Sequence, residues 1–153
     1  MIPLRIGRLT LRAHVGLVVI AAVLYALGGD LWIRYLLLLA TLLLHELAHA
    51  LVSLLFRGER AVVSLWPWGG VAHVERFSDF REAVVALAGP ASNLAVAGGA
   101  AAAGGEFSLE LGRCPPLDFV FTCNLVMGLA NLIPIPGLDG GRALRIFLRR
   151  QPN

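Results

Sequence analysis

The apolar segment around residue 45 carries two histidines and a glutamate. The ten residues from Leu42 to Leu51 are Leu-Leu-Leu-His-Glu-Leu-Ala-His-Ala-Leu, so a His-Glu-x-x-His pattern interrupts a long apolar run. Residues four apart lie on one face of a helix, so His45 and His49 can bind one metal ion together. Glu46 is close enough to hold and deprotonate a water at that metal. The pattern predicts a zinc site inside an apolar helix; the alternative is a chance match on a buried helix of a soluble protein.

The free energy of burying these groups favours the metal. An ionised carboxylate in hydrocarbon costs about 2.5–3.5 kcal/mol on insertion scales. Structural zinc sites bind with roughly 10–16 kcal/mol, which offsets that cost.

The composition predicts an integral membrane protein whose main partner is the lipid bilayer. The 153 residues are 58% hydrophobic and 15% charged, with a mean hydropathy of +0.76. Soluble domains are about 45–50% apolar and about 25% charged. All thirteen basic residues are arginines, and they lie between apolar segments rather than in a patch with aromatic residues. We therefore expect no nucleic-acid partner.

Apolar runs and turn residues predict an all-α polytopic fold formed by residues 1–153 as a single unit. About four transmembrane helices are expected, over residues 13–27, 31–56, 82–103 and 117–133. The first is short for a bilayer crossing of about 20 residues. Residues 1–12 are expected to form an interfacial amphipathic segment, and residues 142–150 a short basic amphipathic helix.

Residues 61–75 predict a small β-hairpin between the second and third spans. The first half is rich in β-branched and aromatic residues, the second half alternates, and Pro67-Trp68-Gly69-Gly70 supplies turn residues.

The arginines predict an orientation. With the amino terminus in the cytoplasm, four spans leave only Arg34 and Arg113 outside, as the positive-inside rule requires. His49 then lies about seven residues, or roughly 10 Å, from the cytoplasmic end of its helix.

A catalytic zinc site needs a third protein ligand. Asp139 follows Asn131-Leu132-Ile133-Pro134-Ile135-Pro136-Gly137-Leu138, where prolines and glycine break an apolar segment. Such breaks are tolerated at membrane depth where they are buried in protein or line a water-filled cavity. Two interpretations stay open on these residues: Asp139 as a metal ligand, or Asp139 as a turn or cap residue at the surface.

Four motifs together resemble the site-2 protease family of intramembrane zinc metalloproteases, over about residues 14–148. They are His45-Glu46-Leu47-Ala48-His49, Trp66-Pro67-Trp68-Gly69-Gly70-Val71-Ala72, Ala88-Gly89-Pro90-Ala91-Ser92-Asn93, and the segment from Asn131 to Arg142. The resemblance implies that His45, His49 and Asp139 bind one Zn²⁺ and that Glu46 is the general base. It also implies a hairpin that borders the cleft and pairs with an unwound substrate as an added strand.

The resemblance further places Asn131 near the substrate, where its amide could bind a carbonyl or the developing oxyanion, worth about 2.7–4 kcal/mol elsewhere. The alternative for Asn131 is a helix-to-helix hydrogen bond that repairs the proline break. Asn93 is expected to hold the broken third span against the fourth, and Gly89 to be a packing residue.

The function implied is zinc metalloendopeptidase activity on transmembrane segments of other membrane proteins, as in regulated intramembrane proteolysis, in the plasma membrane of a prokaryote. One alternative is a non-proteolytic zinc-containing binding module, which would need a fourth protein ligand such as His14 or His73. Another is a membrane metallopeptidase whose third ligand is a glutamate such as Glu75 or Glu82. Relatives often carry additional spans or domains, so we expect the chain to be a minimal core, a truncated product or one part of a homo-oligomer.

Overall fold

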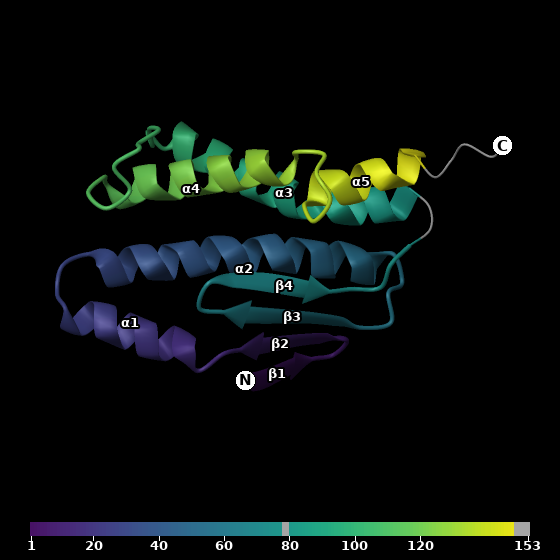
Figure 1. The fold of residues 1–153 in the computed structure, drawn as a ribbon, viewed down its shortest axis with the longest axis horizontal. Helices are drawn as coiled ribbons and strands as arrows, with labels where there is room; N and C mark the ends of the chain where they lie inside the picture. The colour runs from purple at the N-terminus through teal and green to yellow at the C-terminus, as the bar shows by residue number, and fades with distance from the viewer. Residues whose placement is uncertain (78–79, 149–153) are drawn as a thin grey trace.

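The computed structural model describes residues 1–77 and 80–148. Within them the elements follow the order β1 (Ile2–Ile6), β2 (Leu9–Ala13), α1 (Gly16–Ala26), α2 (Leu31–Leu55), β3 (Ala61–Trp66), β4 (Gly69–His73), α3 (Phe80–Ala102), α4 (Pro116–Asn131) and α5 (Asp139–Leu148). In Figure 1, α2 lies between two layers. The sheet and α1 form one layer, and α3, α4 and α5 form the other, with α3 packed against α2, α4 and α5.

The central helix α2 turns its polar side chains inward and leucines outward. Its buried residues are Arg34, Thr41, His45, His49, Ala50 and Ser53. Leu31, Leu36, Leu44, Leu51 and Leu55 are exposed. This is the reverse of a water-soluble helix, and it is what a bilayer favours, because polar groups in transmembrane helices face the bundle interior.

Two of the four expected spans are long enough to cross a membrane. Helices α2 and α3, with 25 and 23 residues, meet the length and composition of a span. Helix α1 has 11 residues and α4 has 16, against the ~20 that a perpendicular crossing needs. Four transmembrane helices are therefore not confirmed.

The all-α prediction is wrong in one respect, because the chain contains a four-stranded sheet of order β1-β2-β3-β4. The predicted hairpin within residues 61–75 is confirmed as β3 and β4, which pair from Val62↔His73 to Trp66↔Gly69. Strand β2 pairs with β3 in parallel, so the α1–α2 helical hairpin connects neighbouring strands. Val63 and Ala61 of β3 pack with Ala50 of α2 in a buried apolar cluster.

The amino-terminal segment is a second hairpin, not an amphipathic interfacial segment. Strands β1 and β2 pair antiparallel from Ile2↔Ala13 to Ile6↔Leu9, which leaves Gly7 and Arg8 as the turn. Gly7 has φ of 59°, as the two-residue turns of β-hairpins require.

The carboxy-terminal helix was expected over residues 142–150. Helix α5 begins three residues earlier, at Asp139 itself, and the last two expected residues lie outside the described part of the chain.

Candidate metal centre

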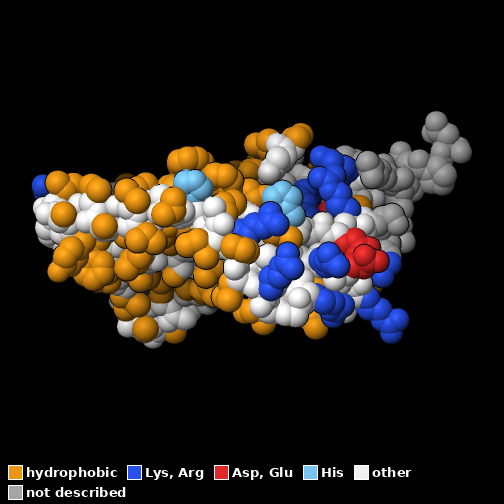
Figure 2. Space-filling view, turned by 90° about the horizontal axis from the view of Figure 1, so that it is seen from below, with side chains coloured by type: hydrophobic (Ala, Val, Ile, Leu, Met, Phe, Trp, Pro, Cys, Tyr) orange, Lys and Arg blue, Asp and Glu red, His pale blue; other side chains and the backbone are white. Residues whose placement is uncertain are grey.

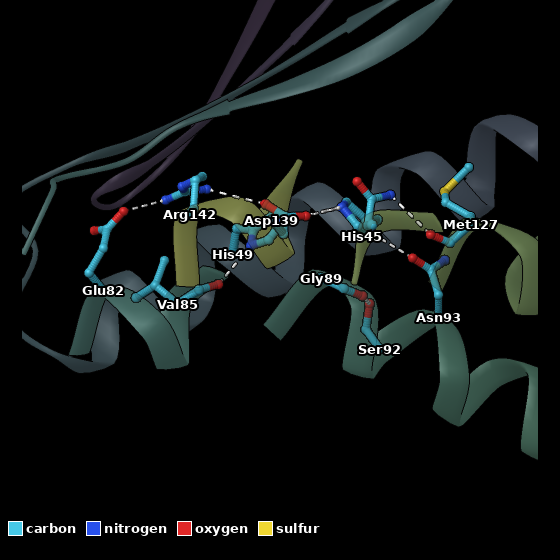
Figure 3. Close-up of polar contacts among 11 residues, drawn as sticks. His45, His49, Glu82, Val85, Gly89, Ser92, Asn93, Met127, Asp139 and Arg142 are labelled. Atoms are coloured by element: carbon cyan, nitrogen blue, oxygen red, sulfur yellow. Dashed lines mark hydrogen bonds and ion pairs between the residues drawn. The ribbon is translucent and has the colours of Figure 1, made fainter. Parts of the chain in front are cut away.

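Two elements far apart in the sequence bring three ligand atoms together. His45 and His49 lie one turn apart on α2, and Asp139 begins α5 (Figure 3). The Asp139 Oδ2 atom is 3.1 Å from the Nε2 atom of each histidine, and the two Nε2 atoms are 3.2 Å apart. All three residues are buried.

The hydrogen bond of His49 fixes which ring nitrogen faces this centre. Its Nδ1 is 2.7 Å from the carbonyl oxygen of Val85 on α3. A carbonyl only accepts, so Nδ1 carries the proton, and Nε2 presents a lone pair.

A longer chain of hydrogen bonds does the same for His45. Asn124 on α4 donates through Nδ2 to the Val120 carbonyl at 2.9 Å, so its Oδ1 is free to accept from Asn93 Nδ2, also at 2.9 Å. Asn93 Oδ1 then faces His45 Nδ1, which donates to it. Asn124 also donates to Thr41 Oγ1 on α2 at 3.0 Å. Both asparagines are fully buried, so the relay sets the His45 tautomer and ties α2, α3 and α4 together.

The donor set fits a divalent cation. Three acceptors, two imidazole lone pairs and a carboxylate oxygen, point at one another within 3.2 Å. The ligand atoms of a tetrahedral zinc ion with bonds of ~2.0–2.1 Å lie about 3.3–3.4 Å apart. Within residues 1–77 and 80–148, no fourth His, Cys or acidic ligand joins the cluster. The site is therefore three-coordinate in protein ligands, as in a catalytic centre.

Gly89 leaves room for that centre. A Cβ atom on Gly89 would overlap the Nε2 atom of His49 and lie 2.7 Å from Nε2 of His45. The sequence suggested only a packing role for this residue, because nothing in the sequence shows that α3 passes directly over the imidazoles.

An ion-pair network of Arg142 and Glu82 binds the second carboxylate oxygen of Asp139, Oδ1. Arg142 Nη1 is 3.4 Å from Asp139 Oδ1, and Arg142 Nη2 is 2.9 Å from Oε1 of the buried Glu82 on α3. Asp139 therefore presents a carboxylate to the centre.

The candidate base, Glu46, lies on α2, and its side chain faces the β3–β4 hairpin. Glu46 is half-buried, and a Cβ atom on Gly70 of β4 would lie 2.8 Å from its Cγ and 3.4 Å from its Oε1. The hairpin backbone therefore approaches the carboxylate at a glycine.

Asn131 is the last residue of α4 and is half-buried. Its Nδ2 donates to the Met127 carbonyl of the same helix at 3.0 Å. Within the described part of the chain its side chain makes no hydrogen bond to another helix, whereas Asn93 does connect α3 to α4 as expected.

We expect Asn93→Ala to weaken zinc binding by about 10–100-fold, because His45 loses the partner that orients it. Competition with a chromophoric chelator measures this affinity. Ser92→Ala is the matched control, since the Ser92 hydroxyl donates to the Gly89 carbonyl at 2.7 Å and not to a ligand. Equal affinities for the two variants would contradict a role of Asn93 at the metal.

Comparison with known proteins agrees with this geometry. The model of peptidase family M50 matches residues 106–153. Rip3 of Mycobacterium tuberculosis, a zinc metalloprotease by its name, is 38% identical over 123 residues, which cover 74% of this chain and 30% of that protein. For sll0528 of Synechocystis, named in the same way, identity is 36% over 124 residues, covering 77% and 33%. The solved structure of the site-2 protease from Methanocaldococcus jannaschii matches with a TM-score of 0.71 at 27% identity, over 98% of this chain and 72% of that one.

The structure therefore combines helices long and apolar enough to cross a membrane with a possible metal centre, formed by the two histidines of His-Glu-x-x-His and a distant aspartate. Residues 106–153 match the peptidase M50 domain, and nearly the whole chain is similar in sequence and fold to a site-2 protease. The chain spans about a third of the length of the curated relatives it matches.

Proposed function

We propose that this chain hydrolyses peptide bonds in or near transmembrane segments of other membrane proteins, as in regulated intramembrane proteolysis. The observation that carries the proposal is the convergence of His45, His49 and Asp139 on one point, with Glu46 adjacent, in a helix whose outer face is apolar. His45, His49 and Asp139 would hold one Zn²⁺, which supplies a Lewis acid that polarises the scissile carbonyl and acidifies water.

The residues of the chain would do the rest of the chemistry. Glu46 accepts a proton from the attacking water and returns it to the leaving amine. Asn93 and Val85 keep both imidazoles in the tautomer that binds metal. Asn131 remains our proposal for a residue near the substrate: one of its two amide N–H groups donates to the Met127 carbonyl, and the second N–H is left to donate to a substrate carbonyl or the developing oxyanion.

Strand β4 is the proposed docking edge for the substrate. It pairs with β3 on one side only and approaches Glu46 at Gly70. An extended peptide added along this edge would bring its backbone beside the general base. A helical peptide bond is shielded by its own hydrogen bonds, so pairing with β4 would also hold it open.

We propose that the sheet end of the molecule lies at the cytoplasmic side of a prokaryotic plasma membrane. Arginine side chains gather at this end, while the other end of the same face is apolar (Figure 2). The positive-inside rule then gives a cytoplasmic amino terminus, and the relatives named above are prokaryotic proteins.

Removal and return of the metal test the proposal. The purified chain, reconstituted in liposomes with a model transmembrane substrate, is expected to cleave it. A zinc chelator should abolish cleavage. Removal of the chelator and addition of one molar equivalent of Zn²⁺ should restore it, because the three ligands would bind the ion reversibly. Cleavage that continues at full rate in the chelator, with zinc shown by elemental analysis to be gone, would overturn the proposed chemistry.

A further inference from the structure

Four arginines line one cavity on the sheet. The cavity measures about 410 Å³; its basic lining residues are Arg5, Arg8, Arg12 and Arg60, and its acidic one is Glu59. We call it the arginine pocket. It lies apart from the metal centre, since none of its lining residues is a metal ligand or contacts one in the hydrogen bonds described above.

Strand register explains why these side chains meet. Leu9 and Leu11 of β2 pack against the α2 core, so the alternate residues Thr10 and Arg12 occupy the opposite face of the sheet. Thr10 is paired with Arg5 on β1 and with Val62 on β3, which places these three side chains in one row across the strands.

The turns complete the pocket at its rim. Arg8 lies in the β1–β2 turn, and its Nη1 donates to the Gly58 carbonyl at 3.1 Å, which fixes its position. Arg60 directly precedes β3. Arg5, Arg12 and Arg60 are exposed, so their guanidinium groups can reach a ligand from outside.

An apolar surface adjoins the pocket. Helix α1 begins at Gly16, four residues after Arg12, and its Val18, Val19 and Val23 are 68%, 55% and 52% exposed. Figure 2 shows basic side chains over one end of this face and a broad apolar surface, the end of α1, over the other. A ligand with an anionic head and an apolar tail matches both features.

We propose that the arginine pocket binds the phosphate of an anionic phospholipid, whose acyl chains lie along the neighbouring apolar surface. Guanidinium groups donate pairs of hydrogen bonds to phosphate oxygens, which lysine cannot do. The chain has arginine at every basic position. The bound lipid would anchor the sheet, and with it β4, at the headgroup level of the bilayer. This inference does not depend on the metal centre or on the proposed proteolysis.

Native mass spectrometry of the chain in non-ionic detergent tests the pocket. The probes are phosphatidylglycerol and phosphatidylcholine with identical acyl chains, titrated separately. We expect the first phosphatidylglycerol to bind more tightly than the first phosphatidylcholine. The double variant Arg5→Gln/Arg12→Gln should weaken phosphatidylglycerol binding by roughly tenfold or more, since each arginine near a lipid surface contributes about fivefold.

The matched control removes the same charge elsewhere. Arg113→Gln/Arg145→Gln changes two exposed arginines outside the sheet and should bind phosphatidylglycerol as the native chain does. Arg8 is left intact because it bonds the Gly58 carbonyl. If the strand double variant melted below the native temperature, Arg60→Gln alone, in the loop before β3, would replace it with an expected loss of about fivefold.

Three results would overturn the proposal. The first is equal affinity of the native chain for the two lipids, and the second is equal affinity of the two double variants for phosphatidylglycerol. The third is displacement of the bound lipid by micromolar inorganic phosphate, which would show that the pocket binds free phosphate and not a phospholipid. We expect millimolar phosphate to leave the lipid bound, because phosphate lacks the acyl chains.

Discussion

The Glu46→Gln variant is expected to lose peptide cleavage by about 10²–10⁴-fold while retaining one zinc per chain. Glutamine has nearly the same shape as glutamate but cannot accept the proton of the attacking water. Glu46 is not part of the three-residue ligand cluster, so metal content should not change. Cleavage of a model transmembrane substrate and elemental analysis of the same preparation measure the two quantities together.

A matched control shows that the effect belongs to this carboxylate. Glu75→Gln changes an exposed glutamate that follows β4 and bonds only the backbone nitrogen of Glu59 in the contacts described here. It should cleave at the native rate. Cleavage by Glu46→Gln equal to that of Glu75→Gln would rule out Glu46 as the base.

The Asp139→Ala variant is expected to lose the metal itself. Outer contacts of a metal site are worth about 10–100-fold in affinity, and removal of a ligand should exceed that range. The substitution also removes the ion pair between Arg142 Nη1 and the Asp139 carboxylate, which are 3.4 Å apart. Zinc content after gel filtration in metal-free buffer is the measurement, and cleavage should fall with it.

Two comparison variants separate an aspartate ligand from a glutamate ligand. Glu75→Ala should keep its zinc, because Glu75 is exposed and outside the cluster. Glu82→Ala should keep more zinc than Asp139→Ala, since Glu82 reaches the site only through Arg142. Zinc loss in Glu75→Ala or Glu82→Ala with full retention in Asp139→Ala would show that the third ligand is misassigned.

Local patterns in the sequence indicated which three residues would lie together. The i,i+4 spacing placed both imidazoles on one face of α2, and the break between Asn131 and Asp139 marked where a carboxylate could enter an apolar bundle. The structure brings these three residues together, while their roles remain for the variants above to test. For Asn131, the rate of Asn131→Leu at unchanged zinc content decides whether it serves the substrate. The homo-oligomer also stays a prediction.

Most of the features that the sequence analysis missed depend on contacts between distant residues. The β1–β2 hairpin had a local signal, Leu4 and Ile6 alternating with Leu9 and Leu11 around Gly7, but three arginines among apolar residues suggest an amphipathic segment equally well. The parallel pairing of β2 with β3 joins residues about fifty positions apart and has no local signature. The orienting role of Asn93 and the clearance at Gly89 arise only once α3 lies across α2.

The proposed third metal ligand, Asp139, is the first residue of α5, 94 residues after His45. A ribosome therefore adds both histidines, the proposed base and the proposed docking edge long before it adds Asp139. Throughout that interval the nascent chain has only two of its three ligands and lacks the arginine that holds the third. Whatever activity the centre has can begin only after α5 has emerged and docked on α3, so translation itself delays it.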